Sequence, residues 1–104
     1  MSILSVTFHT TEDRIEEWDL YVENDLHQMV ENLLDVEQYI LSEVQSDMVS
    51  EGKNTNLFLV FDNDEMRDQF IESELVNLEE RIAHRFGSEV MVFPTFLNPK
   101  KKRF

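Results

Sequence analysis

Histidine is the side chain best suited to proton transfer near neutral pH, and the chain contains three histidines. His9 ends an alternating stretch and falls on the same side of it as Ser5 and Thr7. There it could act as a base or a ligand inside a cavity, although a strand-end histidine bonded to backbone or solvent is the plainer interpretation, which we favour. His27 and His84 fall on separate predicted helices without metal-ligand spacing, so we predict no metal site.

Other motifs with chemical meaning are weak. The run Asp62-Asn63-Asp64-Glu65 resembles the start of a calcium loop, but Met66 at the fifth position breaks the pattern, so a helix cap explains it better. With 2 glycines and no G-x-S-x-G, the sequence has neither a phosphate-cradling loop nor a nucleophile elbow. It has no cysteine for a thiol nucleophile. We therefore predict no cofactor.

Periodicity predicts the elements that must position these residues. Apolar and polar residues alternate over 1–9, which predicts a strand, and a helix follows from Thr11, a candidate cap, to about Leu34. The apolar residues of this helix recur every three or four positions, at Ile15, Trp18, Val22, Leu26, Met29, Val30 and Leu33. Trp18 and Tyr21 could flank a ligand, but this spacing favours a place in the core.

The second half repeats the pattern. Strands are predicted over 36–45 and 57–61, joined through the turn Ser50–Asn54, and a helix begins at the Asp62/Glu65 pair and stops at Gly87. A last strand covers 90–97 and contains Pro94, which suits an edge position. The order β-α-β-β-α-β predicts an α+β, ferredoxin-like domain over 1–98, with strands 1 and 3 central and both helices on one face. Residues 99–104 form a basic tail that we predict to be mobile.

Two helices cover only one face of such a sheet, yet large apolar residues are predicted on both faces. Phe58 and Val60 point opposite to their neighbours Leu57, Leu59 and Phe61. Met91 and Phe93 likewise point opposite to Val90 and Val92. An apolar face of this kind is more often an association site than bare surface. We predict a homodimer, of the dimeric α/β-barrel type, in which these residues together with Ser5, Thr7 and His9 form the paired face or line a cavity.

Charge limits the partners. Lys and Arg number 9 against 22 Asp and Glu, a formal charge of −13, which disfavours nucleic acid and anionic membranes as partners. No apolar run approaches the roughly 20 residues of a membrane span, and the alternating N-terminus does not resemble a signal peptide, so we expect a cytoplasmic protein. The tail could touch RNA or a membrane, but a solvated terminus is the better interpretation.

Arg85–Leu97, with the sequence RFGSEVMVFPTFL, resembles the closing signature R-F-G-D-K-F-x-A-F-R-T-x-L of an uncharacterised bacterial domain-of-unknown-function family, number 4286. Glu16-Glu17-Trp18 with Tyr21 and Val22 is similar to the E-x-W-x-x-W-M segment of that family. The sequence departs from the family at Leu26-His27-Gln28, where members tend to have His-Ile-Pro, and at Pro94, which replaces a basic residue. The resemblance implies a dimeric α/β-barrel fold and transfers no activity.

Three functions remain open on this basis. The first is a dimeric binding or assembly module whose open sheet face pairs with itself and encloses a small hydrophobic ligand. The alternative is a cofactor-independent monooxygenase-like or isomerase-like enzyme with His9 in its cavity, an analogy at the level of the fold. A third is docking of the acidic helices onto a basic protein. A cavity with several converging polar groups favours an enzyme, and an interface filled by apolar side chains favours assembly.

Overall fold

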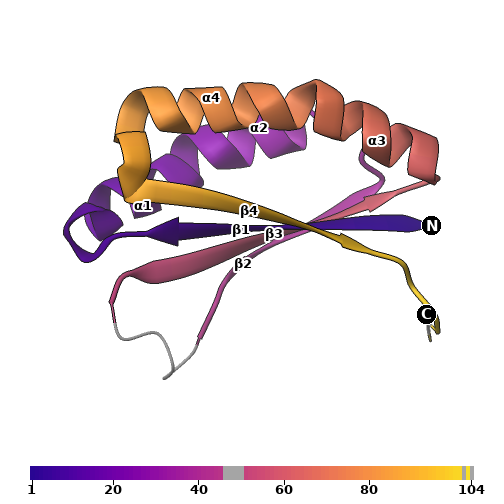
Figure 1. The fold of residues 1–104 in the computed structure, drawn as a ribbon, viewed down its shortest axis with the longest axis horizontal. Coiled ribbons are helices and arrows are strands. Elements are labelled where there is room, and N and C mark those ends of the chain that lie inside the picture. Colours follow the sequence, from indigo (N-terminus) through magenta and orange to yellow (C-terminus); the bar gives the residue numbers. More distant parts are fainter. Residues whose placement is uncertain (46–50, 102, 104) are drawn as a thin grey trace.

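Four strands form one antiparallel sheet in the computed structural model of this chain (Figure 1). The structure describes residues 1–45, 51–101 and 103. β1 (Ser2–Thr10) and β3 (Lys53–Phe61) lie in the centre, and β2 (Gln38–Glu43) and β4 (Val90–Leu97) lie at the edges, in the order β2-β3-β1-β4. The predicted ferredoxin-like arrangement is therefore confirmed, including the edge position of the strand that contains proline.

Two helical segments cover the same face of this sheet (Figure 1). The first segment consists of η1 (Glu12–Arg14), α1 (Ile15–Tyr21), η2 (Val22–Leu26) and α2 (His27–Glu31). The second consists of α3 (Asp64–Glu72), α4 (Glu74–Phe86) and the short η3 (Gly87–Glu89) that leads into β4. In the part of the chain that the structure describes, the other face of the sheet carries no helix (Figure 1).

The first segment is not the regular α-helix that the sequence predicts, because η2 is a π-helical turn. Tyr21 and Leu26 are both buried although they are five residues apart. A continued α-helix would direct Asp25, four residues after Tyr21, towards the core. The wider π turn brings Leu26 to that place instead and leaves Asp25 exposed. The prediction of Trp18, Leu26 and Val30 as core residues is confirmed.

The second segment is also interrupted, at Ser73 between α3 and α4. Its buried residues Phe70 and Leu75 are again five apart, and the Ser73 hydroxyl donates to the Gln69 carbonyl at 2.7 Å. The N-cap is Asn63, whose side chain accepts the Met66 N–H, so the prediction of Asp62 as the cap was wrong by one residue.

Several other boundaries differ from the predictions. β2 is shorter than the predicted strand over 36–45, and β3 starts four residues before the apolar run that begins at Leu57. Thr11 precedes η1 but its hydroxyl donates to the Asp13 carboxylate at 2.9 Å, and its side chain makes no capping hydrogen bond. The predicted stop at Gly87 is confirmed, with φ at 61°. Of the predicted turn, Ser50 lies outside the described residues, as do Lys102 and Phe104 of the tail.

The core lies between the sheet and the helices, around Trp18. Its indole N–H donates to the Thr55 hydroxyl at 3.0 Å, and its ring centroid lies 5.3 Å from that of Phe8 and 5.6 Å from that of Phe86. Tyr21 packs beside it, and burial raises the pKa of the Tyr21 phenol. The prediction of Trp18 and Tyr21 as core residues is confirmed, since they are 0% and 5% exposed.

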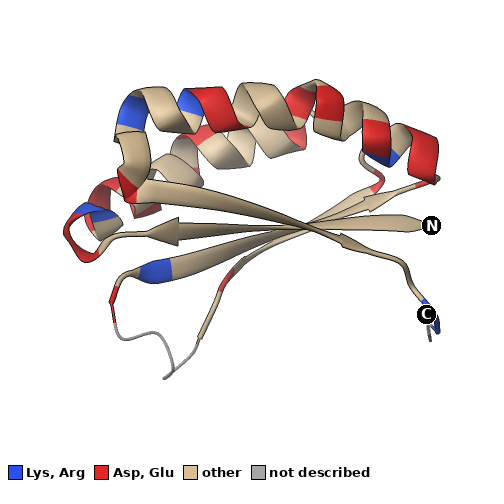
Figure 2. Ribbon diagram, in the orientation of Figure 1, with Lys and Arg blue, Asp and Glu red and all other residues tan. Residues whose placement is uncertain are grey.

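Acidic residues gather on the helices, whereas the strands carry almost no charge (Figure 2). Six acidic residues of the helices are exposed, namely Glu16, Glu23, Glu31, Asp68, Glu72 and Glu79. In the four strands only Glu43 and Lys53 are charged, and they pair with each other at 3.2 Å. Their strand partners Thr55 and Thr10 are buried beneath the helices, so both charges belong to the covered face.

Candidate functional site

The strand pairing defines the residues of the face that no helix covers, which we call the open face. Directly paired residues project to the same side of a sheet, so the register arranges this face in rows. The rows are Met91/His9/Asn54, Phe93/Thr7/Asn56/Ser42, Thr95/Ser5/Phe58/Ile40 and Leu97/Ile3/Val60/Gln38. None of these side chains is charged, in a protein of which 30% of residues are charged.

All the residues predicted for the paired face or cavity lie on the open face. They are Ser5, Thr7, His9, Phe58, Val60, Met91 and Phe93. Ile40 and Leu97 extend the apolar part of the face and are 61% and 38% exposed. The prediction omitted both, although Ile40 falls within the predicted second strand and Leu97 within the fourth.

His9 is held by an asparagine rather than a carboxylate. Its Nδ1 lies 2.6 Å from Asn54 Oδ1, and because an amide oxygen only accepts, Nδ1 carries the proton and Nε2 keeps its lone pair in the neutral ring. Gly52 (φ 84°) lies against the ring, since a Cβ on Gly52 would stand 3.1 Å from Nε2 and 2.1 Å from the Thr10 carbonyl oxygen. His9 is therefore a positioned, half-buried acceptor, and among the described residues no carboxylate pairs with it.

Asn56 organises the rest of the polar centre. Its amide donates to the Ser5 hydroxyl at 2.8 Å and to the Thr7 hydroxyl at 3.3 Å. The polar groups in the middle of the open face are thus already bonded to one another, which lowers the cost of removing them from water. Sequence reasoning missed Asn54 and Asn56, because two asparagines before an apolar run resemble a turn.

The remaining histidines are remote from this centre. His27 Nε2 lies 3.4 Å from the Glu31 carboxylate on the first helical segment, and His84 lies on α4. Within residues 1–45, 51–101 and 103, no group of three or more histidine, aspartate and glutamate side chains is placed to hold a metal ion.

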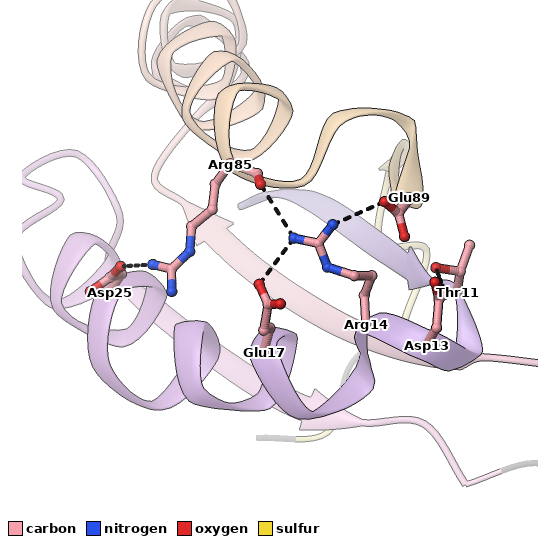
Figure 3. A network of polar contacts seen from close by, with 7 residues as sticks. All are labelled: Thr11, Asp13, Arg14, Glu17, Asp25, Arg85 and Glu89. Atoms are coloured by element: carbon pink, nitrogen blue, oxygen red, sulfur yellow. Dashed lines mark hydrogen bonds and ion pairs between the residues drawn. The ribbon is translucent and has the colours of Figure 1, made fainter.

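Arginine contacts fix the helices against β4 at one end of the sheet (Figure 3). Arg14 donates to Glu89 at 2.9 Å, to Glu17 at 3.0 Å and to the Arg85 carbonyl oxygen at 3.3 Å. Arg85 in turn pairs with Asp25 at 2.9 Å, the residue that the π turn leaves at the surface. These contacts join both helical segments to η3 and so hold the start of β4, with Met91 and Phe93, in place.

Comparison with known families gives one match. The chain matches the family described as Domain of unknown function (DUF4286) over residues 1–100. No curated protein matches the chain. Within the described residues, none of the helices is both long and apolar enough to cross a membrane.

Several solved structures share the fold at low sequence identity. HapK from Hahella chejuensis has a TM-score of 0.69 at 8% identity, with 100% of this chain and 97% of that chain covered. A putative antibiotic biosynthesis monooxygenase from Deinococcus radiodurans gives 0.68 at 12%, with the same coverage. A dimeric ferredoxin-like protein from an uncultured marine organism gives 0.58 at 7%, with 99% and 100% covered. At these identities the similarity concerns the fold alone.

Proposed function

The chain belongs to the DUF4286 family, and on that premise we propose that it is a dimeric binding or assembly module whose open face pairs with the same face of a second copy. The observation that carries this proposal is an uncharged sheet face with Phe93 50% and Met91 44% exposed, in a protein of charge −13. Exposed apolar patches of this kind mark interaction sites. The structural neighbour from an uncultured marine organism is a dimeric ferredoxin-like protein, which gives further support.

The size of the open face suits a modest interface. Four strands spaced about 4.8 Å apart and about eight residues long present on the order of 500 Å² per copy. Both copies together approach 1,000 Å², roughly the lower limit for a specific interface. Corrugation by Phe58, Phe93 and Met91 increases the contact area. Charges stay on the helices, on the outside of the pair, so association costs no desolvation of ions.

Size-exclusion chromatography with light scattering tests the proposal. The wild type is expected near twice 12.4 kDa, or 24.8 kDa, at micromolar concentration. Phe93→Glu places a charge inside the paired faces and is expected to give a monomer. Leu34→Glu is the matched control, because Leu34 is 97% exposed and lies away from the sheet. A wild type of 12.4 kDa, or two variants with the same mass, contradicts the proposal.

The enzyme alternative is favoured by one observation, the position of His9 on the open face, held through Nδ1 by Asn54 and near Ser and Thr side chains. A cofactor-independent monooxygenase or isomerase needs such a group beside an enclosed space between the paired faces. A crystal structure of the dimer distinguishes the two functions. A void bordered by His9 supports a small hydrophobic ligand and the enzyme, whereas an interface filled by Phe58, Met91 and Phe93 leaves assembly alone.

The proposal also includes the cytoplasm as the location, because a domain without cysteine folds without disulfides in a reducing compartment. Residues 1–98 act as one unit in it, and the basic residues of 99–104 are not needed for pairing.

A further inference from the structure

On the other side of the sheet from the open face, the two helical segments leave a cavity between them. Residues after the π turn, Val30 and Leu33, form one wall, and Phe70 and Leu78 on either side of the Ser73 break form the other. Leu57 of β3 is the floor. The Ser73 break lies beside the cavity, between the lining residues Phe70 and Glu74, whereas the π turn ends at Leu26, three residues before Met29, the first lining residue of its segment.

The inner part of the cavity is apolar. The cavity volume is about 230 Å³, and the buried side chains of Val30, Leu57, Phe70 and Leu78 line its inner part. Its polar lining residues are Asn32, Glu74, Asn77 and Arg81. An apolar cavity of about 150 Å³ is large enough to bind benzene. The space between the helices can therefore hold a short hydrocarbon chain or a small ring.

A second, more open groove of about 930 Å³ continues from this cavity between the helices. Four residues line both spaces, namely Met29, Asn32, Asn77 and Arg81. The cavity thus has a mouth, and the mouth is polar. A ligand with an apolar body inside and a polar head at the mouth would meet matching groups in both places.

Arg81 differs from the other basic residues of the described helices and strands. Arg14, Lys53, Arg67 and Arg85 each have a carboxylate within ion-pair distance. Within the residues that the structure describes, Arg81 has none, and its side chain donates only to Met29 Sδ at 3.4 Å. A thioether is a weak acceptor, so the guanidinium at the mouth retains most of its capacity to bind an anion.

We propose that this helix-side cavity binds a small amphipathic monocarboxylate, with its apolar chain between the helices and its carboxylate on Arg81. Guanidinium and carboxylate form two parallel charge-assisted hydrogen bonds, and Asn77 at the mouth adds an amide donor. Glu74 and Glu80 also line the walls, but both are exposed and can turn to water. At physiological salt the field of the remaining acids is screened beyond about 8 Å.

Calorimetric titration of the full chain with sodium octanoate tests the proposal. Octanoate is expected to bind in the millimolar range or tighter, and at least about tenfold tighter than 1-octanol or octylamine, which have the same chain without the carboxylate. Arg81→Gln is expected to weaken octanoate about tenfold and to leave 1-octanol unchanged. Lys101→Gln makes the same change in net charge at the terminus and is expected to leave octanoate binding unchanged.

A second variant tests the cavity itself. Leu33→Trp, at the half-buried wall, is expected to abolish binding of both octanoate and 1-octanol while the circular dichroism spectrum remains that of the wild type. If the variant unfolds, amide shifts of the wild type with octanoate decide the location, and shifts away from 29–33 and 70–81 overturn the proposal. Tighter binding of octylamine, no binding of octanoate, or equal effects of Arg81→Gln and Lys101→Gln also overturn it. Binding that persists in Phe93→Glu separates this site from the open face.

Discussion

The two faces of the sheet come from the same strands and differ in what they do with apolar side chains. In β1, Leu4, Val6 and Phe8 are completely buried beneath the helices. Ser5 and Thr7, which alternate with them in the sequence, project from the open face. The covered face has a dense aromatic core around Trp18, and the open face has bonded polar groups bordered by exposed Phe93 and Met91. One face is complete within a single chain, and the other gains most from a second chain.

This difference explains where charge is tolerated. The covered face has charged residues only at its margin, where Lys53 pairs with Glu43 and with Asp19 of the first helical segment. The open face admits no charge in any of its rows. Charged residues are depleted in the cores of protein interfaces, so an uncharged face supports the pairing that we propose.

The largest effect is expected on the covered face. Trp18→Ala removes the centre of the core and leaves the Thr55 hydroxyl without its donor, which is expected to lower the free energy of unfolding by about 3–5 kcal/mol. Urea denaturation followed by circular dichroism measures it. Leu20→Ala, 62% exposed on the same helix, is the control and is expected to change stability by less than about 0.5 kcal/mol. Equal losses in both variants would mean that this face is not the core.

On the open face the effect is expected to depend on concentration. If only folded chains associate, association stabilises the folded state by about 2.7 kcal/mol when the protein concentration is a hundredfold above the dissociation constant. The Tm of the wild type should therefore rise between 1 and about 100 μM, and Phe93→Glu should remove that rise. Differential scanning fluorimetry at several concentrations measures both. A wild-type Tm that does not change over this range would contradict pairing through the open face.

A smaller effect is expected at Lys53. Lys53 donates a hydrogen bond to the Asp19 carboxylate and a second to Glu43, and these bonds raise the pKa of Lys53 above its ordinary value of 10.5. A raised pKa in the folded state means that the stabilisation is complete below pH 10.5 and is lost as the pH rises through the folded value. The wild type is expected to exceed Lys53→Gln by less than about 1 kcal/mol at pH 8. Urea titrations from pH 8 to 12 should show this difference vanish, and a constant difference contradicts the assignment.

The smallest effect concerns the acidic helices. Because a charge of −13 repels itself, moderate NaCl is expected to raise the Tm, by about one to three degrees. The same titration near the pI of about 4.4 is the control, where the rise should disappear. A Tm that falls steadily with NaCl at neutral pH would show that attraction between opposite charges outweighs this repulsion.

The strand order could be predicted from a few residues with unambiguous physics. The apolar run from Leu57 to Phe61 indicates a central strand, Pro94 indicates an edge, and Gly87 with positive φ ends a helix. The residues of the open face follow from the alternation of side chains once the strands are known. These predictions depend on local sequence and on the two-residue period, which tertiary packing does not alter.

The helix interruptions were missed for a physical reason. Both occur at a gap of five between buried residues, from Tyr21 to Leu26 and from Phe70 to Leu75. The half-buried Val22 and Ile71 lie four residues before Leu26 and Leu75, so the three-residue and four-residue spacing of apolar residues is unbroken in the sequence. The cavity is lined by residues of both helical segments and of β3, so it could not be predicted from the pattern of any single element. The bond between His9 and Asn54 depends on strand register, which the sequence before the apolar run does not determine.

Pro94 bears on how large the assembly becomes. It lies opposite Val6 in β4, and a proline in an edge strand is accepted where its nitrogen faces solvent, so that edge has a missing donor. A neighbouring strand added there would leave one carbonyl without a partner, which opposes growth into a continuous ribbon. The pairing that we propose through the open face is isologous, so it would close after two copies because each copy uses its only open face. The sheet thus favours a finite particle over a fibre.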